Sequence, residues 1–242
     1  MNKIYRPTLK VLGVGSGTTE ILYGEPSSSF CILNKEKCIL QVDIGFGVTR
    51  AIKKHLEIFP KTIYISHNHL DHAGELPVVS QVFKDQHSKL QILSAPKVQE
   101  KLKKHRLNEI DNGGLNIDEL IDWQKIEPEQ IFHINESFSI EIMQAQHSEI
   151  CYGFRLSYRN KLILAYSADS GYNKAYYEWL SKAPVMILDG RIKSSKDHAS
   201  FDEIAEFSSS LKEKEIYILH YGRSIDKIDN LKCLIPGQLF TL

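Results

Sequence analysis

The six residues from His67 to His72 contain four side chains that can bind a metal ion, namely His67, His69, Asp71 and His72. They directly follow an apolar run over 61–66 that predicts a β-strand. Because side chains alternate along an extended chain, His67 and His69 share a face, and both imidazoles can reach one cation. Asp71 and His72 fall in a predicted turn, which can direct them to a second cation. Imidazole and carboxylate together suit zinc, manganese or iron.

A histidine-rich surface loop that binds no metal is the alternative for these six residues. Further residues of ligand type elsewhere in the chain argue against it, because five predicted strands end on such a side chain. In α/β folds, groups that follow the strands gather outside one edge of the sheet, where loops project them from a rigid support. The five strand-end residues are Asp43, His67, Asp169, Asp189 and His220.

The elements that must position these residues alternate between strand-like apolar runs and amphipathic helical patterns. No internal repeat or linker interrupts them, and this alternation predicts an α/β fold. Proline and capping residues mark several helix boundaries. The predicted strands cover 9–14, 29–33, 38–42, 61–66, 138–144, 151–158, 161–167, 185–188 and 215–219, and the predicted helices cover 48–58, 77–85, 96–107, 173–180 and 201–211.

The chain length of 242 residues fits one large domain with a substantial core. We therefore expect a single domain over 1–242. The segment 108–136 is acidic and weakly patterned apart from a turn at 111–114, so we expect it to be irregular, and it could form a lid.

Charge, hydropathy and cysteine content argue against several classes of protein. The 30 basic and 30 acidic residues cancel, so nothing global indicates a large nucleic acid or a membrane surface as partner. No apolar run approaches the ~20 residues that cross a bilayer, and 1–10 contain no apolar core of a signal peptide. Four scattered cysteines without a CxxC pair predict a cytoplasmic protein with reduced thiols: Cys31, Cys38, Cys151 and Cys233.

The pattern H-x-H-x-D-H after a strand resembles the second motif of the metallo-β-lactamase superfamily, and the resemblance extends over nearly the whole chain. It implies an αββα sandwich, two divalent metal ions and, often, a homodimer. Zinc is the expected metal, and manganese is the alternative because the same mixed set of ligands suits it. The resemblance also implies the ligands: His67, His69 and His147 for one ion, Asp71, His72 and His220 for the other, and Asp169 as the bridging carboxylate.

Two of these ligands have other interpretations when they are considered alone. His147 could be an ordinary loop histidine, and Asp169 could be a helix N-cap. Beside the first motif we favour the ligand role for both, because a carboxylate between two dications offsets their repulsion and fixes their separation near ~3.5–4 Å. Asp43 matches the first motif of the family, which implies that it orients a ligand histidine and does not touch the metal.

His198 indicates a particular branch of the superfamily. The His-x-Ser step from His198 to Ser200, before the last predicted helix, is similar to the phosphodiesterase branch that includes tRNase Z. In that branch the histidine contacts phosphate and helps to protonate the leaving oxygen. Ser200 is equally suited to a structural role, as an N-cap that forms a capping box with Glu203. The glycine-rich start over 12–18 and the serine-rich return over 26–29 resemble the same branch and do not match a Rossmann fingerprint.

The resemblance predicts hydrolysis of a phosphodiester. A hydroxide activated by two metals would attack phosphorus in line while the cations neutralise the nonbridging oxygens. His198 is the expected general acid, and Asp71 could position the nucleophile as well as bind metal. Arg191, with Lys193 and Lys196, could add positive charge for a phosphate. The alternative for these three is a solvated basic loop.

The substrate is expected to be small. The tRNase Z family usually carries a long arm between the third ligand and the bridging aspartate, whereas here 21 residues separate His147 from Asp169 and two predicted strands fill them. With zero net charge, this favours a cyclic nucleotide or another small phosphodiester over a large nucleic acid. The basic run over 101–106 predicts the solvated face of a helix. Aromatic residues that could stack on a base are Tyr172, Tyr176 and Trp179.

Other functions remain open at this point. A tRNase Z-type endoribonuclease that processes tRNA 3′ ends would keep all of these residues. A lactonase or thioesterase of the same fold would keep the metal ligands without needing His198. A silent binding module would be expected to have lost ligands, and none is lost. A β-lactamase is disfavoured by the pairing of Asp71 with His72 and by the lack of a secretion signal.

Overall fold

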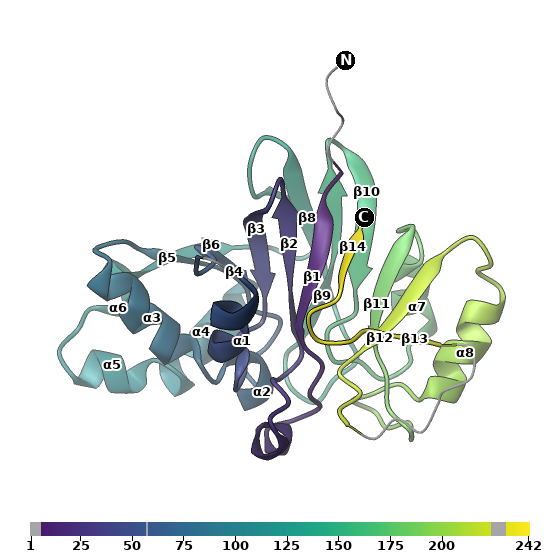
Figure 1. Cartoon of the computed structure of the whole chain (residues 1–242), viewed down its shortest axis with the longest axis horizontal. Coiled ribbons are helices and arrows are strands. Elements are labelled where there is room, and N and C mark those ends of the chain that lie inside the picture. The colour runs from purple at the N-terminus through teal and green to yellow at the C-terminus, as the bar shows by residue number, and fades with distance from the viewer. Residues whose placement is uncertain (1–5, 57, 224–230) are drawn as a thin grey trace. The chain divides into compact units, whose positions relative to one another are not determined.

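The computed structural model of the chain describes residues 6–56, 58–223 and 231–242. It contains two compact units, one formed by residues up to 125 together with 235–242, and the other by 126–234. Within the described residues, each unit is built on one seven-stranded mixed sheet with helices beside it (Figure 1). Each unit therefore brings its own sheet to the fold.

The sheet of the first unit carries antiparallel strands on one side and parallel strands on the other. In spatial order it consists of β14 (Leu239–Thr241), β1 (Thr8–Gly13), β2 (Ser29–Asn34), β3 (Lys37–Val42), β4 (Thr62–Tyr64), β5 (Leu90–Ser94) and β6 (Ile121–Lys125). The pairings from β14 to β3 are antiparallel, and those from β3 to β6 are parallel. Because parallel neighbours point the same way, the loops that follow β3 and β4 leave the sheet at one edge.

Helices supply the crossovers that parallel strands require. They are α1 (Val48–His55), α2 (Leu70–Ala73), α3 (Leu76–Asp85), α4 (Pro96–His105), α5 (Asn108–Asn112) and α6 (Ile117–Leu120), with a 3-10 turn, η1 (Thr19–Tyr23), after β1. Helix α1 buries Val48, Ala51 and Ile52, which is the spacing of one helix face. Among the described residues, no helix is both long and apolar enough to cross a membrane.

The sheet of the second unit has the same mixed character. In spatial order it consists of β13 (Lys232–Cys233), β12 (Glu215–Leu219), β11 (Val185–Asp189), β10 (Lys161–Tyr166), β9 (Tyr152–Tyr158), β8 (Phe138–Gln144) and β7 (Ile131–His133). Strands β10 to β13 are parallel, and β7 to β10 pair antiparallel. Helices α7 (Lys174–Leu180) and α8 (Phe201–Ser209) lie beside β11, β12 and β13 (Figure 1).

Most predicted elements are present, and two strands, β8 and β12, have the predicted bounds. The helix predicted over 48–58 ends at His55, because Leu56 is already extended, and residue 57 lies outside the described residues. Residues 1–5, which belong to the segment 1–10 that was expected to contain no signal peptide, also lie outside the described residues. The capping box at Ser200 forms as expected, with Glu203 as its second member.

The expectation of irregular structure over 108–136 was wrong. This segment contains α5, α6, β6 and β7. Its elements are short, and β6 and β7 are edge strands, so few positions are buried on a regular period and the sequence pattern is weak. In β6 only Ile121 is fully buried, although all five residues pair in register with β5. Strand β5 itself was not predicted.

Gly45 allows the loop after β3 to meet helix α2. The backbone N–H of Ile44 donates to the carbonyl of His72 at 2.7 Å, and the N–H of Glu75 donates back to the carbonyl of Ile44 at 2.9 Å. A Cβ atom on Gly45 would overlap the backbone carbonyl of Asp71. The position of α2 therefore depends on the absence of a side chain at residue 45.

Substituting Gly45→Ala is expected to destabilise the fold, because the overlap is with backbone and the segments must separate. Overpacking of this kind costs about 1–3 kcal/mol, which urea unfolding monitored by circular dichroism would measure. Gly113→Ala is the matched control, because its Cβ would lie 3.3 Å from the nearest carbonyl oxygens. Equal unfolding free energies for the two variants would contradict the prediction.

Candidate metal centre

The first unit holds the predicted ligands of the H-x-H-x-D-H motif just beyond β4. His67 is fully buried, His69 occupies the N-cap position of α2, and α2 carries Asp71 and His72. The ring centroid of His67 lies 4.6 Å from that of His69 and 4.2 Å from that of His72. Asp71 and His72 thus lie on a one-turn helix where the sequence predicted a turn. The irregular step between β4 and α2 gathers the imidazoles in a small volume.

Asp43 anchors this cluster. Its carboxylate, fully buried, accepts hydrogen bonds from the Ser66 backbone N–H (2.8 Å) and hydroxyl (2.9 Å), and its Oδ2 lies 2.8 Å from Nδ1 of His72. The Ser66 hydroxyl also lies 3.0 Å from Nδ1 of His67. Both imidazoles are therefore held through Nδ1, so that Nε2 is the atom for a metal. Such carboxylate–histidine contacts orient the ring and raise its basicity as a ligand.

The spacing of donor atoms in this unit fits a common cation. Nε2 of His72 lies 3.7 Å from Oδ2 of Asp71. Two atoms bound at ~2.0–2.2 Å to one tetrahedral ion lie roughly 3.3–3.6 Å apart, so a small adjustment would bring both onto it. Imidazole nitrogens with a carboxylate suit zinc or manganese, whereas calcium prefers a shell made of oxygens. The donor set of the first unit therefore fits the expected class of metal.

The second unit gathers a separate group of possible metal-binding side chains beyond the ends of β8, β10, β11 and β12. Asp169 is at its centre, with Oδ2 3.9 Å from Nε2 of His147 and Oδ1 3.0 Å from Nδ1 of His220. Nδ1 of His220 also lies 3.1 Å from Oδ1 of Asp189. One donor atom each of Asp169, Asp189, His198 and His220 falls within 4.8 Å of the others. This unit also offers imidazole and carboxylate in the combination that suits zinc or manganese.

Backbone strain accompanies these ligands. Asp43 has φ 57°, Ala168 has φ 51° and His220 has φ 60°, the left-handed region that side chains other than glycine rarely adopt. Asp43 and His220 directly follow β3 and β12. Ala168 lies two residues after β10 and next to the predicted ligand Asp169. Strained backbone of this kind persists where the surrounding structure fixes it, typically at functional sites.

His198 is held beside the carboxylates of the second unit. Its Nδ1 lies 2.7 Å from Oδ2 of Asp189 and 3.9 Å from Oδ2 of Asp169. The Ser195 hydroxyl accepts the backbone N–H of His198, and Asp197 accepts the N–H of Ser148 at 2.6 Å. The loop that carries His198 is thus tied to the loop that carries the predicted ligand His147. With Nδ1 on Asp189, Nε2 is the ring nitrogen of His198 that is turned away from this carboxylate.

The carboxylates and imidazoles of the second unit shift one another's pKa values. Burial and the charge of Asp169 would raise the pKa of Asp189, but the hydrogen bonds of His198 and His220 prevail and its pKa is lowered. Burial alone would lower the pKa of His220, yet the charge and hydrogen bond of Asp169, with that of Asp189, raise it to about 10. The two carboxylates therefore favour the protonated ring of His220, and a cation that used this ring would have to displace the proton.

Arg191 lies beside the buried cluster, and its contact with a phosphate stays a prediction. Its Nε lies 3.7 Å from Oδ1 of Asp189, and one terminal nitrogen lies 3.2 Å from Nδ1 of His220. Its guanidinium is thus engaged with the buried cluster, whereas Lys193 and Lys196 are exposed. Asp189 was noted only as a strand-end residue, and that position was the signal for its role.

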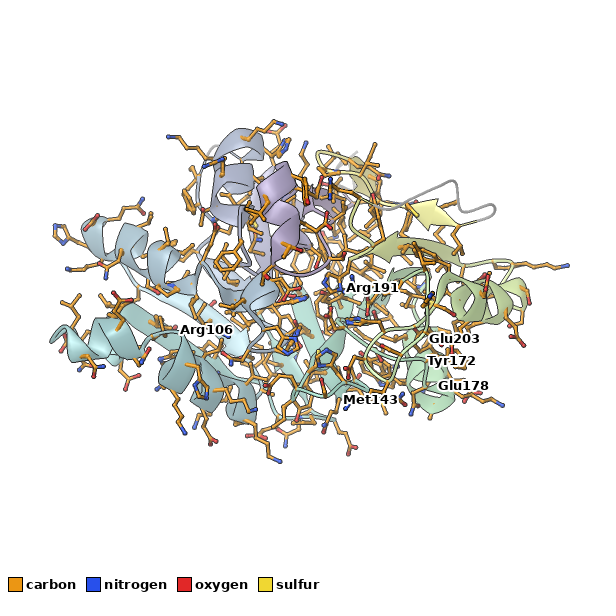
Figure 2. The ribbon with its side chains drawn as sticks, turned by 90° about the horizontal axis from the view of Figure 1, so that it is seen from below. Arg106, Met143, Tyr172, Glu178, Arg191 and Glu203 are labelled. Atoms are coloured by element: carbon orange, nitrogen blue, oxygen red, sulfur yellow. The ribbon has the colours of Figure 1, made fainter. Side chains whose placement is uncertain are left out.

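The aromatic residues of the second unit do not form a single stacking surface. Tyr176 is 2% exposed and donates its hydroxyl to the Ser167 carbonyl at 2.6 Å, so it belongs to the core. Trp179 stacks on Tyr176 and under Arg155. Tyr172 packs against Tyr177 and lines a separate groove of 360 Å³ between α7 and α8 (Figure 2). The expectation that Tyr176 could stack on a base was wrong, because the ring is buried.

Known proteins resemble this chain in family and in fold. A family model described as "Anti-Pycsar protein Apyc1" matches residues 7–233. The chain is similar to the metallo-beta-lactamase fold protein YhfI from Bacillus subtilis, with a TM-score of 0.80 and 17% identity over 98% of this chain and 99% of that one. No curated protein matches the sequence.

Two further solved structures have comparable likeness. One is a diphosphatase from the PhnP family, with a TM-score of 0.75 and 18% identity over 98% of this chain and 97% of that one. The other is human tRNase Z, short form, with a TM-score of 0.72 and 14% identity over 97% of this chain and 98% of that one. Likeness along the full length confirms the predicted α/β metallo-β-lactamase fold, the αββα class.

Replacing Asp43→Asn is expected to weaken zinc binding by roughly 10–100-fold, because the amide cannot hold His72 and Ser66 as the carboxylate does. Competition with a chromophoric chelator would measure the affinity. The exposed Asp85, at the end of α3, provides the control variant Asp85→Asn. Zinc affinity in Asp43→Asn within threefold of the control would show that Asp43 does not support the ligands.

Proposed function

The chain belongs to the family described as "Anti-Pycsar protein Apyc1", and from this membership we propose that it is a metal-dependent phosphodiesterase that hydrolyses a cyclic nucleotide. The family description agrees with degradation of a cyclic nucleotide. The observation that carries the chemistry is the pair of His198 and Asp189, 2.7 Å apart beside Asp169. A lactonase or thioesterase would have no need of this pair.

Two divalent metal ions would be held by the ligands that the resemblance implies. His67, His69 and His147 would hold one ion, Asp71, His72 and His220 would hold the other, and Asp169 would offer its carboxylate to both. The support is the superfamily resemblance and the donor chemistry that each unit offers. Two divalent cations, zinc or manganese, would supply a hydroxide nucleophile near neutral pH and positive charge for the phosphate.

The chain's own residues complete the reaction. His198 gives the proton at Nε2 to the oxygen that leaves phosphorus, while Asp189 fixes its ring through Nδ1. Asp71 would accept a hydrogen bond from the attacking water and so align it with phosphorus. Asp43 and Ser66 keep the rings of His67 and His72 in place. Opening of a 3′,5′-cyclic phosphate then yields a nucleoside monophosphate without loss of the phosphoryl group.

A small substrate is favoured over tRNA by the short path between two ligands. Residues 148–168, between His147 and Asp169, consist of a loop and the paired strands β9 and β10. No residues remain between these two predicted ligands for a long arm such as the one that tRNase Z uses. A tRNase Z-type endoribonuclease is the second candidate, because the His-x-Ser step from His198 to Ser200 is shared with that branch.

His198→Ala is expected to lower diester turnover by roughly 10²–10⁴-fold, because the leaving oxygen loses its proton donor. The assay would use bis(p-nitrophenyl) phosphate and a panel of 3′,5′-cyclic nucleotides with zinc or manganese, and it would record bound metal for each variant. His133→Ala is the matched control, because His133 is exposed on β7.

No diester turnover by metal-loaded wild-type protein would contradict the proposed substrate class. A precursor tRNA would then test the second candidate, and lactones and thioesters would test the remaining activities of this fold. Turnover that His198→Ala leaves unchanged would remove the general-acid role.

Asp189→Asn is expected to lower turnover through His198, because the amide holds the ring less firmly in its donating orientation. Turnover of the single variants and of the double variant with His198→Ala would be compared as a double-mutant cycle. We expect Asp189→Asn to cost at least tenfold in the wild-type background and much less in the His198→Ala background. Equal losses in both backgrounds would show that Asp189 acts elsewhere, through His220 for example, and bound metal would identify that case.

A further inference from the structure

Arg106 contacts the backbone of the metal-binding motif. Its Nε and one terminal nitrogen both donate to the carbonyl oxygen of Asn68, at 3.2 and 2.6 Å. Asn68 stands between the predicted ligands His67 and His69, and only 7% of it is exposed. The sequence had placed Arg106 on the solvated basic face of a helix. The Arg106 guanidinium is therefore hydrogen-bonded to the backbone between the two predicted ligands.

The support for this guanidinium is rigid. Arg106 is the C-cap residue of α4, and its N–H donates to the carbonyl of Leu102 at 2.9 Å. Leu102 and Leu107 are both fully buried, so the backbone on either side of Arg106 is anchored in the core. Figure 2 shows Arg106 at the end of this helix in the first unit. The side chain of Arg106 thus holds the Asn68 carbonyl in place, although the two residues are 38 positions apart in the sequence.

The segment 66–69 needs such a contact because it is neither strand nor helix. On its upstream side, Ser66 is fixed by Asp43. On its downstream side, the His69 carbonyl accepts the first hydrogen bonds of α2, from His72 and Ala73. Arg106 holds the carbonyl between these two ends. A forked, charged donor gives stronger and more directional hydrogen bonds than a neutral one.

We propose that Arg106 is a positioning residue for the metal site. By donating two hydrogen bonds to the Asn68 carbonyl, it fixes the directions in which His67 and His69 present their rings. The inference rests on the proposed function for the identity of these two ligands. It assigns to Arg106 an effect on metal affinity and coordination geometry, and none on proton transfer. Two neighbouring cations of α4 are placed differently, since Lys103 pairs with Asp118 and Lys104 is exposed.

The test compares Arg106→Gln and Arg106→Lys with Lys104→Gln, which removes a cation from the same helix. Zinc affinity would be measured by chelator competition, and the cobalt-substituted protein would report ligand geometry through its visible absorption spectrum. We expect Arg106→Gln to weaken zinc binding by roughly 10–100-fold, as loss of a supporting contact around a metal typically does, and to change the cobalt spectrum. Arg106→Lys, with one point-charge donor, is expected to recover part of the affinity, and Lys104→Gln to match wild type.

The outcomes separate positioning from general stability. Wild-type zinc affinity and cobalt spectrum in Arg106→Gln would overturn the proposal, whatever the change in its unfolding temperature without metal. If Arg106→Gln fails to fold, Arg106→Lys decides, because unchanged affinity and spectrum in that variant would overturn it. A wild-type protein that binds metal but hydrolyses no diester would contradict the proposed function alone. A wild-type protein that binds no zinc would contradict both.

Discussion

The burial of the Asp43 carboxylate is the constraint on which the first unit depends. An ionised carboxylate out of water is costly unless its oxygens are satisfied by hydrogen bonds or opposite charge. Asp43 finds its partners on Ser66 and His72, in the loop after the next parallel strand and in α2. The need to satisfy one charge therefore fixes the ends of β3 and β4 against α2. The predicted ligands His67 and His72 obtain their orientation from the same group of contacts.

The second unit solves a similar problem with Asp189. This carboxylate, 1% exposed at the end of β11, contacts His198, His220 and the backbone N–H of Ser170. Arg191 adds a compensating positive charge at 3.7 Å. In each unit a buried aspartate at a strand end thus holds imidazoles through Nδ1. The rigid sheet sets the position of the carboxylate, and the carboxylate sets the rings.

The sequence was sufficient for those parts of the protein that depend on local pattern. The positions of Asp43 and His220 directly after strands were predicted from the sequence, and the capping box at Ser200 was predicted from spacing alone. It was not sufficient where partners are distant along the chain. The contact of Arg106 with Asn68 depends on how α4 packs, and local pattern made this arginine look solvated. Edge strands such as β6 were missed because only one of their residues is fully buried.

In the proposed function, the loop over 190–200 adapts this fold to one reaction. The predicted metal ligands could serve several hydrolytic reactions, whereas the proposed proton donation to an alkoxide would require His198. Three hydrogen bonds hold that loop. The Ala199 N–H donates to the Ser170 carbonyl, the Phe201 N–H donates to the Arg191 carbonyl, and the Ser148 N–H donates to the Asp197 carboxylate. A loop held at so many points keeps its histidine in place without substrate. In the proposed reaction, these hydrogen bonds would therefore support the role of His198 by fixing its position.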